Sequence, residues 1–250
     1  MSFPILHQDA ACVAIAKPPG ILVHRTPLAR DRQFVLQQLR DQIGQRLYPI
    51  HRLDRATSGV LIFGLSSEAA RRMKQAFDHQ QVRKEYLAIV RGWPNPSEGR
   101  IDRPIRAPDQ DQYREAVTEY RRLKTSLLPV ANQRYPATRF SLVALMPETG
   151  RRHQLRIHME RIAYPIIGDS THGDGEPNRI FRDRLGLRRL MLHARHLRLP
   201  HPMEPEHSLS LTAEPGDDFA RAMTLLGWQR GPTETEHIEL DTVPEAKPDT

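Results

Sequence analysis

The sequence is poor in cysteine and in long apolar runs. Its 250 residues contain one cysteine, Cys12, so an internal disulfide and a Cys-x-x-Cys metal or redox motif are both excluded. No stretch approaches the roughly 20 apolar residues that span a bilayer. Residues 1–10 lack the basic segment and apolar core of a secretory signal. These absences predict a cytoplasmic protein.

Acidic residues are fewer than basic ones, and they are unevenly placed. The chain has 37 Lys and Arg against 30 Asp and Glu, a net charge of +7. Residues 229–250 carry more anions than cations, so the rest of the chain is more basic than the whole. A basic body favours a polyanionic partner such as a nucleic acid. The tail, 229–250, is rich in Pro, Glu and Thr without periodicity and is predicted to be disordered.

Apolar periodicity predicts both strands and helices in the remaining chain. Strands are predicted at 12–16, 21–24, 60–65, 83–93, 116–120, 138–145 and 190–197. Helices are predicted over 33–47, from an N-cap at Ser66 or Ser67 through Phe77, over 153–162, and after Pro215. Residues 94–115, rich in proline and charge, are predicted to be a long connection. No interior linker marks a second domain, so residues 1–228 are predicted to form one domain.

Residues 51–61 are the most informative stretch of the chain. Asp54 lies two residues after Arg52 and one before Arg55, and a turn of small residues, Thr57 to Gly59, follows. An Asp between two arginines is expected to be ionised at neutral pH, and the small residues would let a substrate approach closely. Such a carboxylate can attack an electrophilic carbon without a general base to activate it. By itself, however, an Arg-x-Asp sequence is more often a structural ion pair.

The stretch resembles the catalytic motif of the RluA-type pseudouridine synthases. That motif reads His-Arg-Leu-Asp-x-x-Thr-Ser-Gly, and each of its positions is matched between His51 and Gly59. Other segments resemble further motifs of the family in the same order, namely 17–20, 84–92, 149–156, 165–169 and 192–194. The resemblance covers residues 3 to about 228. It implies an α+β fold with a large mixed, mostly antiparallel sheet flanked by helices and loops.

The resemblance also implies a reaction, the isomerisation of uridine to pseudouridine in RNA. The C1′–N1 bond breaks, the uracil turns and its C5 joins C1′, and no external cofactor is required. Asp54 is then the essential carboxylate, which either adds to C1′ or removes a proton from C2′; the sequence leaves both routes open. A hydrolytic glycosidase typically uses two carboxylates, and one alone stands out here, which disfavours a nucleoside hydrolase.

The resemblance assigns further roles position by position. Arg156 is expected to pair with Asp54, and Tyr86 to stack on the uracil, exclude water and assist loss of the C5 proton. Among the remaining substrate-binding candidates, Arg52 is expected to fill the space left by the flipped nucleotide, Leu155 to pack on the base and His51 to support the loop. Arg151 is one of several basic residues in 151–200 that are candidates for contact with phosphate. No metal site is predicted: His153 and His158 do not share a helical face, and His193 and His196 point to opposite faces of a strand.

Finer features resemble the branch of this family that acts on uridine 65 of transfer RNA. They lie at 22–25, 30–32, 40–45, 64–69, 134–139 and 167–174, whereas residues 99–115 depart from the expected length and composition. The predicted partner is therefore tRNA, bound by a monomer. Two alternatives remain open: a synthase of the same family acting on ribosomal RNA, and a non-catalytic RNA-binding or chaperone protein.

Asp54→Asn is expected to abolish isomerisation while leaving tRNA affinity nearly unchanged. The amide keeps the size of the side chain but removes the charge that the reaction needs. Pseudouridine formation and filter binding with the same tRNA preparation would check both halves of this expectation. Full activity in the variant would contradict the role given to Asp54.

Overall fold

The computed structural model describes residues 2–25, 33–106, 112–132, 135–173 and 175–228. The tail predicted for 229–250 lies outside these residues, as do residues 30–32, 134 and 174 of the finer motifs. Among the described helices, none is both long and apolar enough to cross a membrane.

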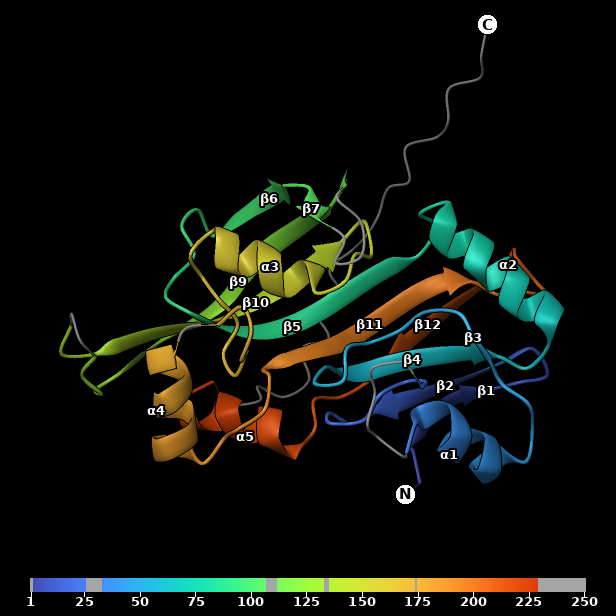
Figure 1. The fold of residues 1–250 in the computed structure, drawn as a ribbon, viewed down its shortest axis with the longest axis horizontal. Coiled ribbons are helices and arrows are strands. Elements are labelled where there is room, and N and C mark those ends of the chain that lie inside the picture. The colour runs from blue at the N-terminus through green and yellow to red at the C-terminus, as the bar shows by residue number, and fades with distance from the viewer. Residues whose placement is uncertain (1, 26–32, 107–111, 133–134, 174, 229–250) are drawn as a thin grey trace, which may run out of the picture.

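A ten-stranded sheet runs through the molecule (Figure 1). Its main path is β1 (Ile5–Gln8), β2 (Cys12–Lys17), β4 (Ser58–Gly64), β11 (Leu192–Pro200), β5 (Arg83–Arg91), β10 (Thr138–Pro147), β9 (Val117–Leu128) and β6 (Glu98–Asp102). β12 (Ser208–Thr212) pairs with β11, and β3 (Tyr48–Pro49) pairs with β4. A small second sheet joins β7 (Ile105–Arg106) to β8 (Tyr113–Arg114). Among the pairings between the described strands, β4 with β11 is parallel and the others are antiparallel, which confirms the mixed, mostly antiparallel α+β fold.

Helices cover the sheet at several places (Figure 1). They are α1 (Val35–Ile43), α2 (Ser67–Asp78), α3 (Gln154–Arg161), α4 (Gly175–Leu185) and α5 (Asp217–Leu225). α2 shows why its sequence forms a helix: the Ser66 hydroxyl accepts the Ala69 N–H at 3.1 Å, which caps the helix as predicted. Ala69, Met73 and Ala76, at helical spacing, are its buried residues.

Alternate residues of the central strands pack into different clusters. In β4, Val60 and Ile62 pack with Met73 of α2, whereas Leu61 and Phe63 pack with residues of α1. Strand β5 divides in the same way, with Ala88 in one cluster and its neighbours Leu87 and Ile89 in another. Both faces of these strands are therefore buried, which explains why their sequences read as continuous apolar runs.

The elements that sequence periodicity missed are polar or short. The predicted connection 94–115 contains β6, which pairs with β9 at the edge of the sheet. β6 buries Ile101, whereas Glu98, Arg100 and Asp102 are exposed. β12 and α4 were not predicted. β12 is only five residues long, and α4 is only weakly amphipathic. The strand predicted at 21–24 was wrong: Leu22 makes one isolated bridge to Phe34.

The parallel pairing of β4 and β11 positions the loop that carries Asp54. That loop runs from β3 to β4, and Ser58 and Gly59 at its end lie opposite His193 and Ala194 of β11. Gly59 has φ of +118°, and a Cβ there would lie 2.0 Å from the backbone oxygen of Ala194. Only glycine lets the two backbones approach this closely.

Gly59→Ala is therefore expected to lower the free energy of unfolding by about 3 kcal/mol or more, because the new methyl group overlaps the β11 backbone. Gly44→Ala is the matched control: Gly44 is also at positive φ, +69°, but a Cβ there meets nothing within 4 Å. That change is expected to cost about 1 kcal/mol, the strain of a left-handed backbone alone. Urea denaturation measures both, and equal losses would contradict the proposed contact.

Candidate active site

A cavity of about 330 Å³ opens beside Asp54. Its volume lies within the range of small-molecule sites. Its wall comes from the loop before β4, from β5, and from the segment that leads into α3. All seven residues proposed from the sequence line it: His51, Arg52, Asp54, Tyr86, Arg151, Leu155 and Arg156.

Lys17, at the start of the turn at residues 17–20, makes hydrogen bonds to the backbone of the Asp54 loop. Lys17 is buried, and its ammonium lies at hydrogen-bond distance from the carbonyl oxygens of Pro18 (2.9 Å), Arg55 (3.2 Å) and Thr57 (2.8 Å). Burial and the nearby Arg189 charge lower the pKa of Lys17 to about 7, against the opposing pull of the Asp54 charge. Spacing along the chain does not predict this role for Lys17, because it does not show that the side chain reaches across to this loop.

Arg156 joins Asp54 to a second carboxylate, that of Asp169. Its Nη1 lies 3.3 Å from Asp54 Oδ2, while its Nε and Nη2 donate to Asp169 Oδ2 at 2.5 Å and to Asp169 Oδ1 at 2.7 Å. The side chain of Asp169 is 1% exposed and that of Arg156 is 9% exposed. This is a buried bidentate pair with one guanidinium nitrogen left to point at Asp54.

The charge state of this group follows from its hydrogen bonds. Burial raises the pKa of Asp169, but bonds from Arg156 and from the backbone N–H groups of His172 and Thr171 outweigh burial and leave the pKa below its ordinary value. For Arg156, burial lowers the pKa, but the two carboxylates outweigh burial and raise it. Both groups are therefore charged at neutral pH, and the resemblance had pointed to Asp169 without assigning it a role.

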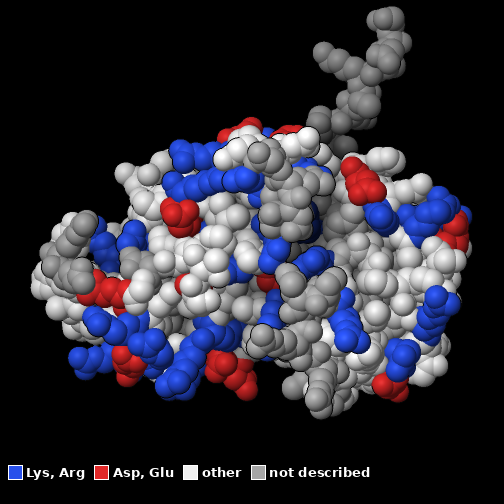
Figure 2. Space-filling model, viewed as in Figure 1, with Lys and Arg blue, Asp and Glu red and all other residues white. Residues whose placement is uncertain are grey.

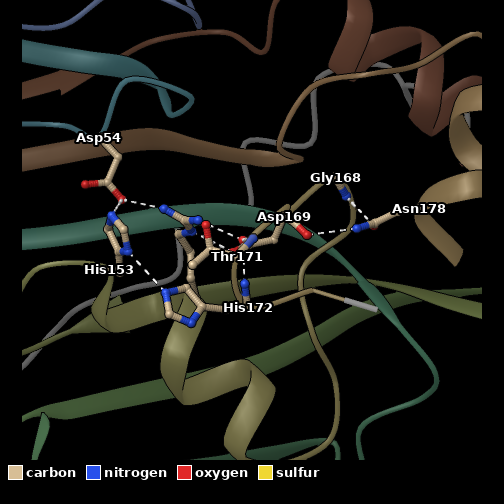
Figure 3. Close-up of polar contacts among 8 residues, drawn as sticks. Asp54, His153, Gly168, Asp169, Thr171, His172 and Asn178 are labelled. Atoms are coloured by element: carbon tan, nitrogen blue, oxygen red, sulfur yellow. Dashed lines mark hydrogen bonds and ion pairs between the residues drawn. The ribbon is translucent and has the colours of Figure 1, made fainter. Parts of the chain in front are cut away.

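The loop that carries Asp169 is itself anchored by α4 (Figure 3). Gly168 N–H donates to Asn178 Oδ1 at 2.7 Å, and Asn178 Nδ2 donates to the Asp169 carbonyl at 2.8 Å. Both contacts cross from the loop to a helix that periodicity did not predict. Asn178 thus positions Asp169, and through Asp169 it positions Arg156.

His153 is a further residue beside Asp54 that the sequence analysis did not place in the site. It is the N-cap of α3, with a left-handed backbone at φ +56°. Its Nε2 lies 3.8 Å from Asp54 Oδ2, and its Nδ1 lies 3.1 Å from Nε2 of His172. Its place within the motif 149–156 was a signal, but regular helical spacing could not predict a left-handed residue that turns back toward Asp54.

Tyr86 and Leu155 provide apolar walls for the cavity. Both belong to the cluster formed by Ala88 and Val90 of β5 with Met159 of α3. Burial and the Asp54 charge raise the pKa of Tyr86, so its phenol stays protonated at neutral pH. A flat ring beside the carboxylate can stack on a planar base.

His51 supports the loop from behind. Its Nε2 accepts the Ile62 N–H at 3.2 Å, and its ring stacks on Phe77 with centroids 5.1 Å apart. Burial and the Lys84 charge lower the pKa of His51 to about 4, so the ring is neutral and can accept this bond. The geometry fits the supporting role predicted for His51.

Two exposed arginines stand at the mouth of the cavity. Arg52 belongs to the Asp54 loop, and Arg151 donates from Nε to the Glu115 carbonyl at 2.9 Å. On the face drawn in Figure 2, Lys and Arg side chains spread more widely than Asp and Glu. This surface favours a polyanion.

Away from the cavity, the described residues hold one cluster of possible metal ligands, His7, Asp9 and Cys12, with their ligand atoms within 4.8 Å of one another. Asp9 Oδ1 accepts the Ala11 and Cys12 N–H groups, both at 2.7 Å, and Oδ2 contacts His7 at 2.6 Å and His201 at 3.1 Å. These contacts fasten the β1–β2 turn to the end of β11, and none of these side chains lines the cavity.

Comparison with known proteins identifies a family that matches most of the chain. The family model described as RNA pseudouridylate synthase matches residues 11–161. A Pasteurella multocida protein named tRNA pseudouridine synthase C is 46% identical over 239 residues, which cover 91% of this chain and 98% of that protein. A Salmonella typhimurium protein of the same name is 46% identical over 248 residues, 94% of each chain. The solved structure titled "Human RNA Pseudouridylate Synthase Domain Containing 4" matches with a TM-score of 0.70 and 28% identity, over 90% of this chain and 93% of that one.

Asp169→Asn is expected to lower the free energy of unfolding by about 3 kcal/mol, because it leaves the buried Arg156 without its paired charge. Asp183→Asn is the control, since Asp183 pairs with Arg182 on the surface and its loss should leave stability unchanged within error. Because the pKa of Asp169 is lowered on folding, its contribution is present above its unfolded pKa and is lost as pH falls through the lower, folded value. Denaturation at neutral and acidic pH measures this, and an equal effect of the two substitutions would contradict it.

Proposed function

The chain belongs to the RNA pseudouridylate synthase family, and we propose that it isomerises a uridine of transfer RNA, uridine 65, to pseudouridine. The family expected from the motifs is thereby confirmed. The tRNA substrate is supported by the near full-length similarity to proteins named tRNA pseudouridine synthase C. Position 65 is supported by the finer sequence features. The observation that carries the chemistry is a single carboxylate, Asp54, held through one oxygen at the wall of a cavity.

A uridine paired in a stem cannot reach Asp54 while it stays stacked. It must leave the helix and enter the cavity, at a cost of a few kcal/mol. Exposed Arg52 at the mouth is proposed to fill the space that the base vacates. Arg151, on the opposite segment of the wall, is proposed to contact a phosphate. Contacts of this kind offset the cost of extruding the base.

Asp54 is proposed to act through Oδ1. Its other oxygen, Oδ2, faces both Arg156 and His153, and no described residue makes a hydrogen bond to Oδ1. In one route Oδ1 bonds to C1′ as the C1′–N1 electron pair leaves with uracil; C5 of the turned base then displaces it. In the other route Oδ1 takes the C2′ proton as N1 leaves, and returns it when C5 has joined C1′. Each route ends with loss of the C5 proton and protonation of N1, so atoms and charge balance.

Tyr86 is proposed to stack on the detached uracil. The base must turn within the cavity without escaping, and an aromatic wall permits rotation in its plane while excluding water. A raised pKa keeps the phenol protonated, which favours stacking over a role as base for the C5 proton. Leu155 is proposed to pack on the base as a second apolar wall.

We propose that residues 1–228 act as one catalytic domain in the cytoplasm, where the proposed substrate is found. We also propose that the protein acts as a monomer; the described residues of one chain place Asp54, Tyr86 and Arg156 around the same cavity. The continuous sheet that joins β1 to β6 supports a single domain.

Pseudouridine mapping tests the substrate directly. The protein is incubated with tRNA and ribosomal RNA that lack pseudouridine, and modified sites are mapped in both. The expected product is pseudouridine at position 65 of tRNA and nowhere in ribosomal RNA, with Asp54→Asn as the inactive control.

Other outcomes would overturn specific parts of the proposal. Product confined to ribosomal RNA would replace the tRNA assignment with the ribosomal one. Binding of tRNA without product would support a non-catalytic RNA-binding or chaperone protein. Free uracil would identify a hydrolase.

A further inference from the structure

We infer that His153 is a positioning residue for Asp54, and that His172 orients His153 through a hydrogen bond between the two rings. The inference rests on the proposed function of Asp54. Asp54 Oδ2 already contacts the charged Arg156, and the neutral His153 would be its second partner.

The contacts form a closed ring of side chains and backbone (Figure 3). From Asp54 Oδ2 the path leads to His153 Nε2 at 3.8 Å, and from His153 Nδ1 to His172 Nε2 at 3.1 Å. The His172 backbone N–H then donates to Asp169 Oδ1 at 2.9 Å, Asp169 binds Arg156, and Arg156 returns to Asp54 Oδ2. The segment around Asp169 therefore supports Asp54 from two sides.

The chemistry of the groups sets the direction of the hydrogen bonds. An ionised carboxylate only accepts, so a bond to Asp54 requires the proton of His153 to be on Nε2. Burial lowers the pKa of His153, and Arg156, Arg152 and His172 lower it further. The Asp54 charge raises this pKa but does not outweigh them, so the ring is neutral near pH 7. Its Nδ1 is then an acceptor, and His172 must donate from Nε2. Both rings are therefore in the Nε2–H form.

The backbone of His153 explains how its ring reaches Asp54. A left-handed residue other than glycine is uncommon, although histidine adopts this conformation more readily than most, and such residues cluster at functional sites. At φ +56° the residue lies just before α3 rather than within it. The ring turns toward the Asp54 loop instead of following the helix.

The contact of 3.8 Å is longer than a hydrogen bond, as catalytic contacts often are before substrate binds. Shortening of this contact on uridine binding would hold Oδ2 between a cation and a neutral donor. Oδ1 would then be directed at the ribose. Because His153 is neutral, it orients the carboxylate without further reducing its negative charge.

Single-turnover rates with tRNA test the inference. His153→Ala is expected to lower the rate on the order of 10-fold to 100-fold, while tRNA affinity stays within about 2-fold. His153→Gln, whose amide can donate to Asp54, should recover much of the rate. His172→Phe should lower the rate by a smaller factor, and adding it to His153→Ala should cause no further loss, because the two act as one unit. His207→Gln, an exposed histidine that does not line the cavity, is the control and should match the wild type.

The pH profile separates this role from a merely structural one. Protonation of His153 would place a proton on Nδ1, against the donor of His172, so the wild-type rate should fall as His153 is protonated. His153→Gln has no such group, and the acid limb of its profile should move to lower pH. The other charged or titratable groups that act on His153 are Asp54, Arg152, Arg156 and His172, and His153→Gln retains all four.

Several results would overturn the inference. A wild-type rate in His153→Ala, additive losses in the double variant, or an unchanged acid limb in His153→Gln would each do so. If His153→Ala fails to fold, the Gln variant and His172→Phe decide the question. Failure of the wild-type protein to form pseudouridine would instead overturn the proposed function, so the two failures are distinguishable.

Discussion

The guanidinium of Arg156 lies between the carboxylates of Asp54 and Asp169, and the geometry of the site depends on how its nitrogens are divided between the two. Asp169 takes two of its nitrogens at 2.5 and 2.7 Å, whereas Asp54 receives the third at 3.3 Å. The tighter pair is buried and holds the cation in one orientation. Asp54, with its side chain 20% exposed, therefore meets a fixed cation but keeps one oxygen directed away from it. A carboxylate in this state is oriented and still lines the cavity.

The rest of the fold brings this arrangement together from distant parts of the chain. Asp54 and Arg156 are 102 residues apart. The loop of Asp54 is fastened by Lys17 below it and by the close approach of Gly59 to β11, while Asn178 of α4 fastens the loop of Asp169. Lys17 is buried, Gly59 allows a close approach of two backbones, and the half-buried Asn178 binds the loop backbone, so each anchor restrains the backbone rather than a side chain. Arg52 and Arg151, which are proposed to contact RNA, are in contrast exposed.

A site with anchored loops around the carboxylate and exposed arginines outside it fits an isomerisation in which the detached base stays on the enzyme. A single carboxylate suffices because the detached base returns to the same carbon, so a second acid for a departing alcohol is unnecessary. In the proposed mechanism, the phenol of Tyr86 and the apolar Leu155 retain the base, and the polar ring of Arg156, Asp169, His172 and His153 holds the carboxylate. Each of these groups would then serve either retention or orientation, and the exposed arginines would add affinity for a polyanion.

The sequence alone identified the family and a candidate catalytic carboxylate, and it predicted the strands and helices with strong periodicity, because these depend on residue types at short, regular spacing. Asp54, Tyr86 and Arg156 were all identified from motifs of this kind. Tertiary structure decided what depends on long-range contacts: the burial of Lys17, the pairing of Asp169 with Arg156, and the left-handed turn of His153 toward Asp54. It also decided the polar edge strand β6 and the helix α4, whose weak periodicity is compensated by backbone pairing and packing. Periodicity reports which side of an element is buried, whereas only the folded chain shows which side chains meet there.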